Sequence, residues 1–246
     1  MITHEVQSFH DFHDIIHGYR RDRRWIFRGH NSLSWDLVPK IGREEYNILE
    51  RNAYFESFKR RAIEFTAIQP IDEWDWIAFA QHHGLPTPLL DWSYNPLVAA
   101  YFATYPFSQA DCCVYAFRPV NALTTDEVAP ETFEGVAKFV PRGVAQRIVR
   151  QGGIFTYHNP PQTKLEDGLK SNDRLEKIVI KESYRQNMVF DLDRYCVNEM
   201  TLFPDIDGLS RYMAWSGRSD VRSYWTNCGK KEPDLTVEAP AGLRSD

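Results

Sequence analysis

The stretch AQHHGLPTPLLDWSYNPLVAAYFA, residues 80–103, places histidines, prolines, an aspartate and a tryptophan directly before a run of small and aromatic residues. Asn95 and Pro96 are typical of a helix start, because Asn caps the first turn and Pro fits the first helical position. The run NPLVAAYFA therefore predicts a buried helix. The preceding PLLDWS predicts a short buried strand that brings Asp91 and Ser93 to the N-terminus of that helix. A strand end beside a helix N-terminus suits an anion or a nucleotide.

Each of these residues also has an ordinary structural interpretation. Asp91 and Ser93 can bind their own backbone in a turn. The pair His83-Gly84 can end a helix, with the glycine in the left-handed conformation. Function is therefore inferred from their combination and not from any single residue.

Composition limits the class of protein. The chain has 246 residues, 43% hydrophobic and 26% charged, which predicts one large globular domain with or without an appendage. A net charge of -5 argues against a generally basic nucleic-acid-binding surface, although a local cationic cleft is compatible with it. Four cysteines form no C-x-x-C pair and the helix at residues 8–19 offers no ligand partners for its histidines, so no metal is expected. With no signal peptide and no run of ~20 apolar residues, we expect a soluble cytoplasmic protein that does not enter a membrane.

The hydrophobic pattern outside this block predicts short strands and helices in irregular order, which is typical of an α+β fold. We expect a small mixed or antiparallel split sheet around a cleft, with flanking helices. The tail from residue 216 is charged and weakly patterned, so it is expected to be loosely packed or disordered. The predicted helices cover SFHDFHDIIHGY, EEYNILERNAYFESFKRRAIEF, IDEWDWIAFAQHH, GVAQRIVRQ, YRQNMVFDLDRYCV and LFPDIDGLSRYMAW, and the predicted strands RRWIFRG, CCVYAFRP, VAKFVP, GGIFTY and LEKIVIK.

Four segments in this order resemble the FRG domain family: FRGH, the block quoted above, RQGGIFT and LFPDIDGL. The resemblance runs from about Trp25 to Tyr212, and it predicts an FRG-type domain over residues 1–215 followed by a charged C-terminal tail over 216–246. The chain departs from the pattern at Pro88, where the family form GLPTRLLDWS has an arginine.

A second resemblance is to the ADP-ribosyltransferase superfamily, in which a strand ending in Arg-Gly is followed by a strand carrying a serine that leads into a helix. It implies an ADP-ribosyltransferase-like fold with NAD as the substrate. Arg28 would hold the NAD phosphates, Ser93 would orient the nicotinamide ribose, and both would face one cleft. The residues implied to contact NAD are Arg28, Gly29, His30, Asp91, Ser93 and Phe155.

The third catalytic element of that superfamily is a carboxylate, and its place here is open. Gln151 in RQGGIFT stands roughly where it would fall, but an amide cannot act as a base near neutral pH. Glu199 and Glu176 are the alternative carboxylates, and His83 is a candidate general base. The catalytic set is therefore Arg28, His83 and either Gln151 or a carboxylate such as Glu199.

Two main classes of function and a weaker third one follow. The first is an NAD-dependent ADP-ribosyltransferase acting on a nucleic-acid or protein acceptor, as a toxin or phage-defence effector would. The second is a non-catalytic module that senses a nucleotide or nucleic acid, which the amide at Gln151 and the proline at Pro88 favour. A hydrolase is a third class, but the chain has no G-x-S-x-G motif.

Overall fold

The computed structural model describes residues 1–46, 50–66, 70–141 and 153–228. The chain divides into two compact units, Met1–Asn198 and Glu199–Asp246. The expected limits of 1–215 and 216–246 stay a prediction, because the bounds of a compact unit need not coincide with those of a family domain.

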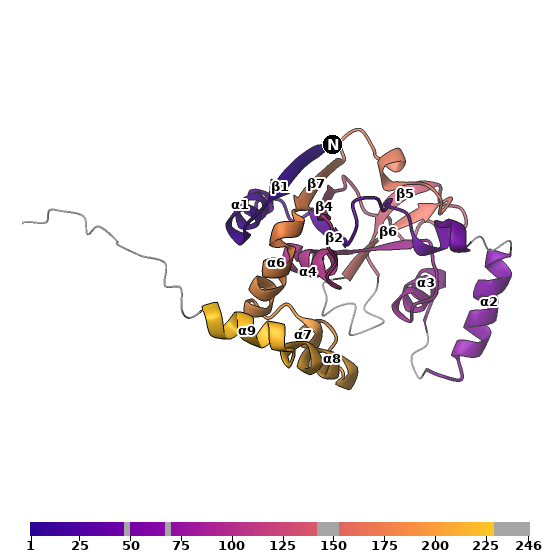
Figure 1. The fold of residues 1–246 in the computed structure, drawn as a ribbon. Helices are drawn as coiled ribbons and strands as arrows, with labels where there is room; N and C mark the ends of the chain where they lie inside the picture. The colour runs from indigo at the N-terminus through magenta and orange to yellow at the C-terminus, as the bar shows by residue number, and fades with distance from the viewer. Residues whose placement is uncertain (47–49, 67–69, 142–152, 229–246) are drawn as a thin grey trace, which may run out of the picture. The chain divides into compact units, whose positions relative to one another are not determined.

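The first unit is built on one open sheet of seven strands, in the order β1-β7-β4-β2-β3-β6-β5 (Figure 1). β1 pairs with β7 in parallel, and the other pairs are antiparallel. The strands are β1 (Ile2–Val6), β2 (Ile26–His30), β3 (Leu89–Ser93), β4 (Cys112–Arg118), β5 (Gly135–Phe139), β6 (Gly153–Asn159) and β7 (Arg174–Ile180). The prediction of an α+β fold with a mixed sheet is confirmed.

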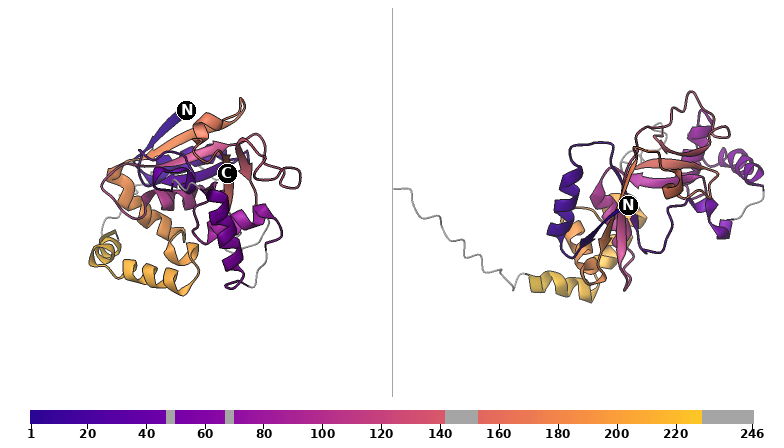
Figure 2. Two further views of the ribbon diagram at one scale, coloured as in Figure 1. Left: turned by 90° about the vertical axis from the view of Figure 1, so that its right-hand side faces the viewer. Right: turned by 90° about the horizontal axis from the view of Figure 1, so that it is seen from above.

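The helices of the first unit are α1 (Phe9–Tyr19), α2 (Arg51–Ala62), α3 (Glu73–His82), α4 (Pro96–Thr104) and α6 (Glu182–Arg194), with short 3₁₀ turns η1 (Lys40–Gly42), η2 (Glu44–Tyr46) and η3 (Leu165–Gly168). Figures 1 and 2 show α3, α4 and α6 on one face of the sheet. The start of α4 follows the sequence prediction, because the Asn95 side chain accepts a hydrogen bond from the Leu97 amide and Pro96 is the first helical residue.

Alternation along β3 sends side chains to two cores. Leu90 and Trp92 pack on one face with two loop residues, Leu37 and Leu165. Leu89 packs on the other face in a cluster with α3 and β6. β3 is therefore covered on both faces. Asp91 is the only one of its five residues that is exposed.

Two elements differ from the expectation. β1 was not expected, and it forms because ITHEV adds in parallel to the edge strand β7. The second unit contains α7 (Glu199–Leu202), α8 (Ile206–Ser216) and α9 (Ser219–Cys228). The tail from residue 216 was expected to be loosely packed or disordered. Residues 219–228 form the helix α9, so disorder is wrong for this stretch, although Val221 is its one buried residue among those with a described side chain. The helix expected over GVAQRIVRQ lies outside the described residues.

Candidate functional site

The sheet is almost divided between β2 and β3. All five residues of β2 pair with β4, and all five residues of β3 pair with β6. Between β2 and β3 only Phe27 and Ser93 pair. The two strands therefore separate beyond Phe27, and we call this opening, with Arg28, His30 and Asp91 around it, the joint.

Arg28 fills the joint. Its Nη1 donates a hydrogen bond to the main-chain oxygen of Asp91 at 2.7 Å, and its Nε donates to Nε2 of His30 at 3.0 Å. The Asp91 carboxylate lies 3.8 Å from Nη1. The Arg28 side chain is 17% exposed and that of Asp91 is 59% exposed, so the ion pair joins a mostly buried cation to an exposed anion. Burial lowers the pKa of Arg28, the Asp91 charge opposes this change, and Arg43 adds to it.

His30 is a buried neutral acceptor. Burial, together with the smaller effects of the positive charges of Arg28, Arg43 and Lys177, lowers its pKa to about 3. Because Arg28 donates to Nε2, the proton of the neutral ring is assigned to Nδ1. The charges of three cationic side chains therefore act on the neutral His30 ring.

A chain of hydrogen bonds leads from the joint to the loop before β3. Nε2 of Gln81, on α3, donates to the Asp91 carboxylate at 2.9 Å. Oγ1 of Thr87 donates to Oε1 of Gln81 at 2.5 Å and accepts from the Leu89 amide at 3.2 Å. Gln81 and Thr87 lie inside the quoted block but were not predicted as site residues. A polar residue near the end of a mainly apolar helix was the signal that could have found Gln81.

Ser93 and Asp91 lie on the same face of β3, because they are two residues apart in the strand. Arg28 starts from the opposite face of β2, since its neighbour Phe27 pairs with Ser93, but its guanidinium reaches the Asp91 carboxylate. The Ser93 hydroxyl is buried and accepts a hydrogen bond from the Asn95 amide at 3.0 Å. This bond gives Ser93 a role in the turn that enters α4.

Gly29 is explained by helix packing. A Cβ atom there would lie 2.0 Å from the Ala99 oxygen and 2.4 Å from the Ala103 nitrogen, both in the backbone of α4. The missing side chain therefore allows α4 to lie directly on β2. The backbone at Gly29 thus approaches α4 closely, and this contact explains the glycine.

The other predicted site residues differ in their surroundings. His83 is exposed after the last turn of α3, and its ring contacts Phe79 at 4.5 Å between centroids. Phe155 pairs with Asp91 in the register of β3 and β6, but its ring is 3% exposed in the apolar core and stacks on Phe139. Gln151 lies outside the described residues. The structure therefore brings together Arg28, His30 and Asp91, and it shows no contact of His83 with these three.

The two carboxylate alternatives have partners of their own. Glu199 belongs to the second unit, where its Oε2 accepts from Nε of Arg211 at 3.1 Å. Glu176 accepts hydrogen bonds from Tyr19 at 2.8 Å and from His4 at 3.1 Å. Arg211, Tyr19 and His4, which bond these carboxylates, are not among the partners of Arg28 named above.

The described residues contain no group of three or more His, Cys, Asp or Glu side chains placed to hold a metal ion. None of the described helices is both long and apolar enough to cross a bilayer.

In comparison with known protein families, residues 23–112 match the family model described as the FRG domain. This range contains Arg28, His30, Gln81, Asp91 and Ser93, and it excludes Gln151, Phe155 and Glu199. No curated protein and no solved structure matches the chain.

Proposed function

Taking residues 23–112 as an FRG domain, we propose that this domain binds a nucleotide at the joint between β2 and β3 and serves as a non-catalytic sensing module. Arg28 would bind a phosphate of the nucleotide. The observation that carries the proposal is the incomplete charge compensation of Arg28.

A buried guanidinium is stable only when charge and hydrogen bonds compensate for the lost water. Two partners of Arg28 are uncharged, a carbonyl oxygen and an imidazole. Its carboxylate partner lies at 3.8 Å and is mostly in water. A phosphate at the joint would supply the close anion, because Arg binds phosphate oxygens with two parallel hydrogen bonds.

The cations around His30 support an anionic ligand. Arg28, Arg43 and Lys177 each lower the pKa of this ring, so each raises the positive potential there. Like charges repel across short distances, and a bound anion relieves that repulsion. Phosphate is the chemistry this cluster favours.

Sensing is favoured over group transfer by the hydrogen bonding of Ser93. In the transferase hypothesis Arg28 and Ser93 hold the same NAD molecule, yet the Ser93 hydroxyl is buried and accepts a hydrogen bond from the Asn95 amide. Its role in the turn before α4 leaves Arg28 as the residue that would bind the anion.

ADP-ribosyl transfer from NAD to a nucleic-acid or protein acceptor is the second candidate. An ADP-ribosyltransferase-like fold was expected to have a split sheet, and here a single residue pair joins β2 to β3. The order of an arginine strand, a serine strand and a helix also agrees with the resemblance to that superfamily.

Calorimetric titration with NAD, ADP-ribose and ADP tests the proposal, with NAD consumption followed in parallel in the presence of DNA, RNA or cell lysate. We expect binding of at least one of these ligands without NAD consumption. Consumption of NAD with transfer to an acceptor would establish the second candidate instead. Absence of binding to all three ligands would refute a nucleotide site at the joint.

A further inference from the structure

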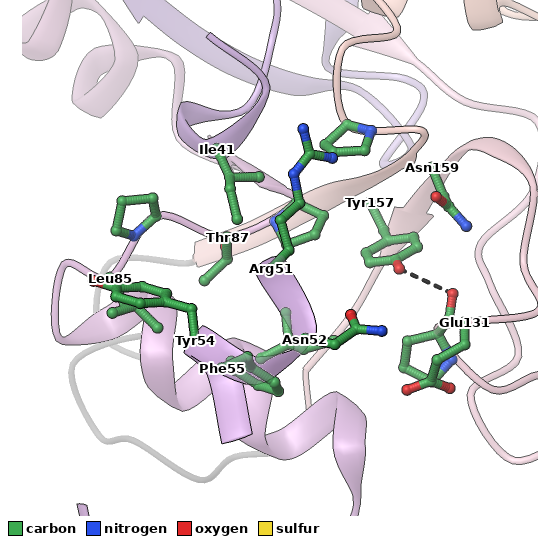
Figure 3. A pocket seen from close by; sticks show the side chains of 15 residues that line it. Ile41, Arg51, Asn52, Tyr54, Phe55, Leu85, Thr87, Glu131, Tyr157 and Asn159 are labelled. Carbon is green, nitrogen blue, oxygen red and sulfur yellow. Dashed lines mark hydrogen bonds between the residues drawn. The ribbon is translucent and has the colours of Figure 1, made fainter. Parts of the chain in front are cut away.

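A separate cavity of about 320 Å³ lies between α2, the segment before β3 and the end of β6 (Figure 3). Its wall is formed by the first two turns of α2, by residues 85–88 and by Tyr157 and Asn159 of β6. It shares no lining residue with the joint. Its volume falls in the range of small-molecule sites.

The lining combines apolar and polar groups. Its apolar side chains are Ile41, Phe55, Ile77, Leu85, Pro86, Pro88, Pro130 and Pro161. Pro88, which stands where the family pattern has an arginine, therefore adds apolar wall to the cavity in place of a positive charge.

Three polar groups of the lining already have partners inside the protein. The Tyr157 hydroxyl donates to the Pro130 oxygen at 2.9 Å, and the Asn159 amide donates to the Phe133 oxygen at 2.6 Å. Thr87 donates to Gln81. These groups shape the cavity and are not the first candidates for recognising a ligand.

Two charged groups of the lining have no ion-pair partner among the residues that the structure describes. Arg51 is the first residue of α2, and Glu131 follows Pro130 in the turn before β5. Figure 3 shows the two side chains well apart, with Tyr157 between them in that view. The charge of Glu131 acts on the Tyr157 hydroxyl: together with burial, the larger cause, it raises the pKa of Tyr157 to about 12.

We propose that this cavity binds a short apolar peptide with free termini, such as a dipeptide. The Arg51 guanidinium would bind the terminal carboxylate and the Glu131 carboxylate the terminal ammonium group. The apolar wall would bury the side chains between them. A single free amino acid fits less well, because its two charges lie on one carbon atom whereas Arg51 and Glu131 lie apart.

The site is tested by calorimetry with leucyl-leucine and two analogues, N-acetyl-leucyl-leucine, which lacks the ammonium group, and leucyl-leucine amide, which lacks the carboxylate. We expect wild-type protein to bind the dipeptide roughly tenfold or more tightly than either analogue, the loss typical of one charge-assisted contact. Arg51→Gln is expected to bind the dipeptide and its amide equally. Glu131→Gln is expected to bind the dipeptide and its N-acetyl form equally.

Arg60→Gln and Glu127→Gln are matched controls, because both side chains are exposed and neither lines the cavity. Both should bind like wild type. Absence of dipeptide binding, or equal losses in the control variants, would overturn the proposal. The nucleotides and the dipeptide are titrated separately on the same wild-type protein, so failure of the nucleotide site and failure of this site give different results.

Discussion

Arg28 donates a hydrogen bond to the main-chain oxygen of Asp91 at 2.7 Å across 63 residues of sequence. The contact lies where β2 and β3 stop pairing, one residue beyond Phe27. A side chain thus takes the place of a main-chain donor in the sheet and satisfies a carbonyl group that would otherwise need water. Arg28 therefore has a structural role at the same position where we propose that it binds a phosphate.

Replacing Arg28 by methionine should weaken nucleotide binding about a hundredfold, because one charged bidentate contact contributes on the order of 2–3 kcal/mol. Arg28→Lys keeps the charge but cannot form both hydrogen bonds, so its loss should be smaller. Calorimetry with ADP-ribose measures the affinity, and circular dichroism checks the fold. The control is Arg24→Met, which removes an exposed arginine bonded to Asp22; an equal loss in this variant would contradict the assignment.

Gly29→Ala should destabilise the first unit by about 3 kcal/mol or more, because the new methyl group would overlap the backbone of α4. Gly18→Ala is the matched control, since no atom lies within 4 Å of a Cβ built there. Because Gly18 lies in the helix α1, Gly18→Ala should stabilise the fold by up to about 1 kcal/mol. Urea unfolding of both variants measures the difference. Similar stability of the two variants would disagree with the packing of α4 on β2.

Acid should destabilise the fold through two buried histidines. Burial lowers the pKa of His30 to about 3 and that of His158 to about 4, against 6.5 for an ordinary histidine. Below about pH 6.5 the unfolded chain therefore binds protons that the folded chain does not, and each histidine lowers the free energy of unfolding by about 1.4 kcal/mol per pH unit. This loss continues down to the folded pKa of each ring.

Urea unfolding at about pH 7, 6 and 5 measures this dependence. In His158→Gln the contribution of one ring disappears, so the part of the slope due to these two histidines should be roughly halved. The ring is held by Thr156 and by the Thr163 oxygen, which makes glutamine a conservative replacement. An unchanged slope in this variant would show that His158 does not control the acid sensitivity.

Ser93→Ala should cost about 1 kcal/mol of stability and leave nucleotide affinity as in wild type. The hydroxyl is buried and accepts a hydrogen bond in the turn before α4, so its role is in that turn. Asn95→Ala is the matched control, because it removes the helix cap in the same turn at a similar cost. Calorimetry and urea unfolding measure both effects. A selective loss of NAD binding in Ser93→Ala would favour ADP-ribosyl transfer over sensing.

The local sequence pattern was sufficient to predict helices and strands whose own residues favour them. The helices at residues 9–19, 73–82 and 96–104 and the strands β2, β3, β4 and β7 follow from hydrophobic spacing and from caps such as Ser8, Asp72 and Asn95. The match of residues 23–112 to the FRG domain covers FRGH and the central block and ends before RQGGIFT and LFPDIDGL. The pairing of β1 with β7 was missed because a five-residue polar strand is stabilised only by the edge it joins.

The sequence by itself determined the α+β class, the elements around the central block and the presence of Arg28, Asp91 and Ser93 in or at the end of short strands. Only the tertiary structure decided which of these residues meet. The register between β2 and β3 sets which side chains can contact each other across the joint, and no local pattern records that register. The close approach of α4 to Gly29 and the chain from Thr87 through Gln81 to Asp91 likewise depend on contacts between separate elements, which only the folded chain contains.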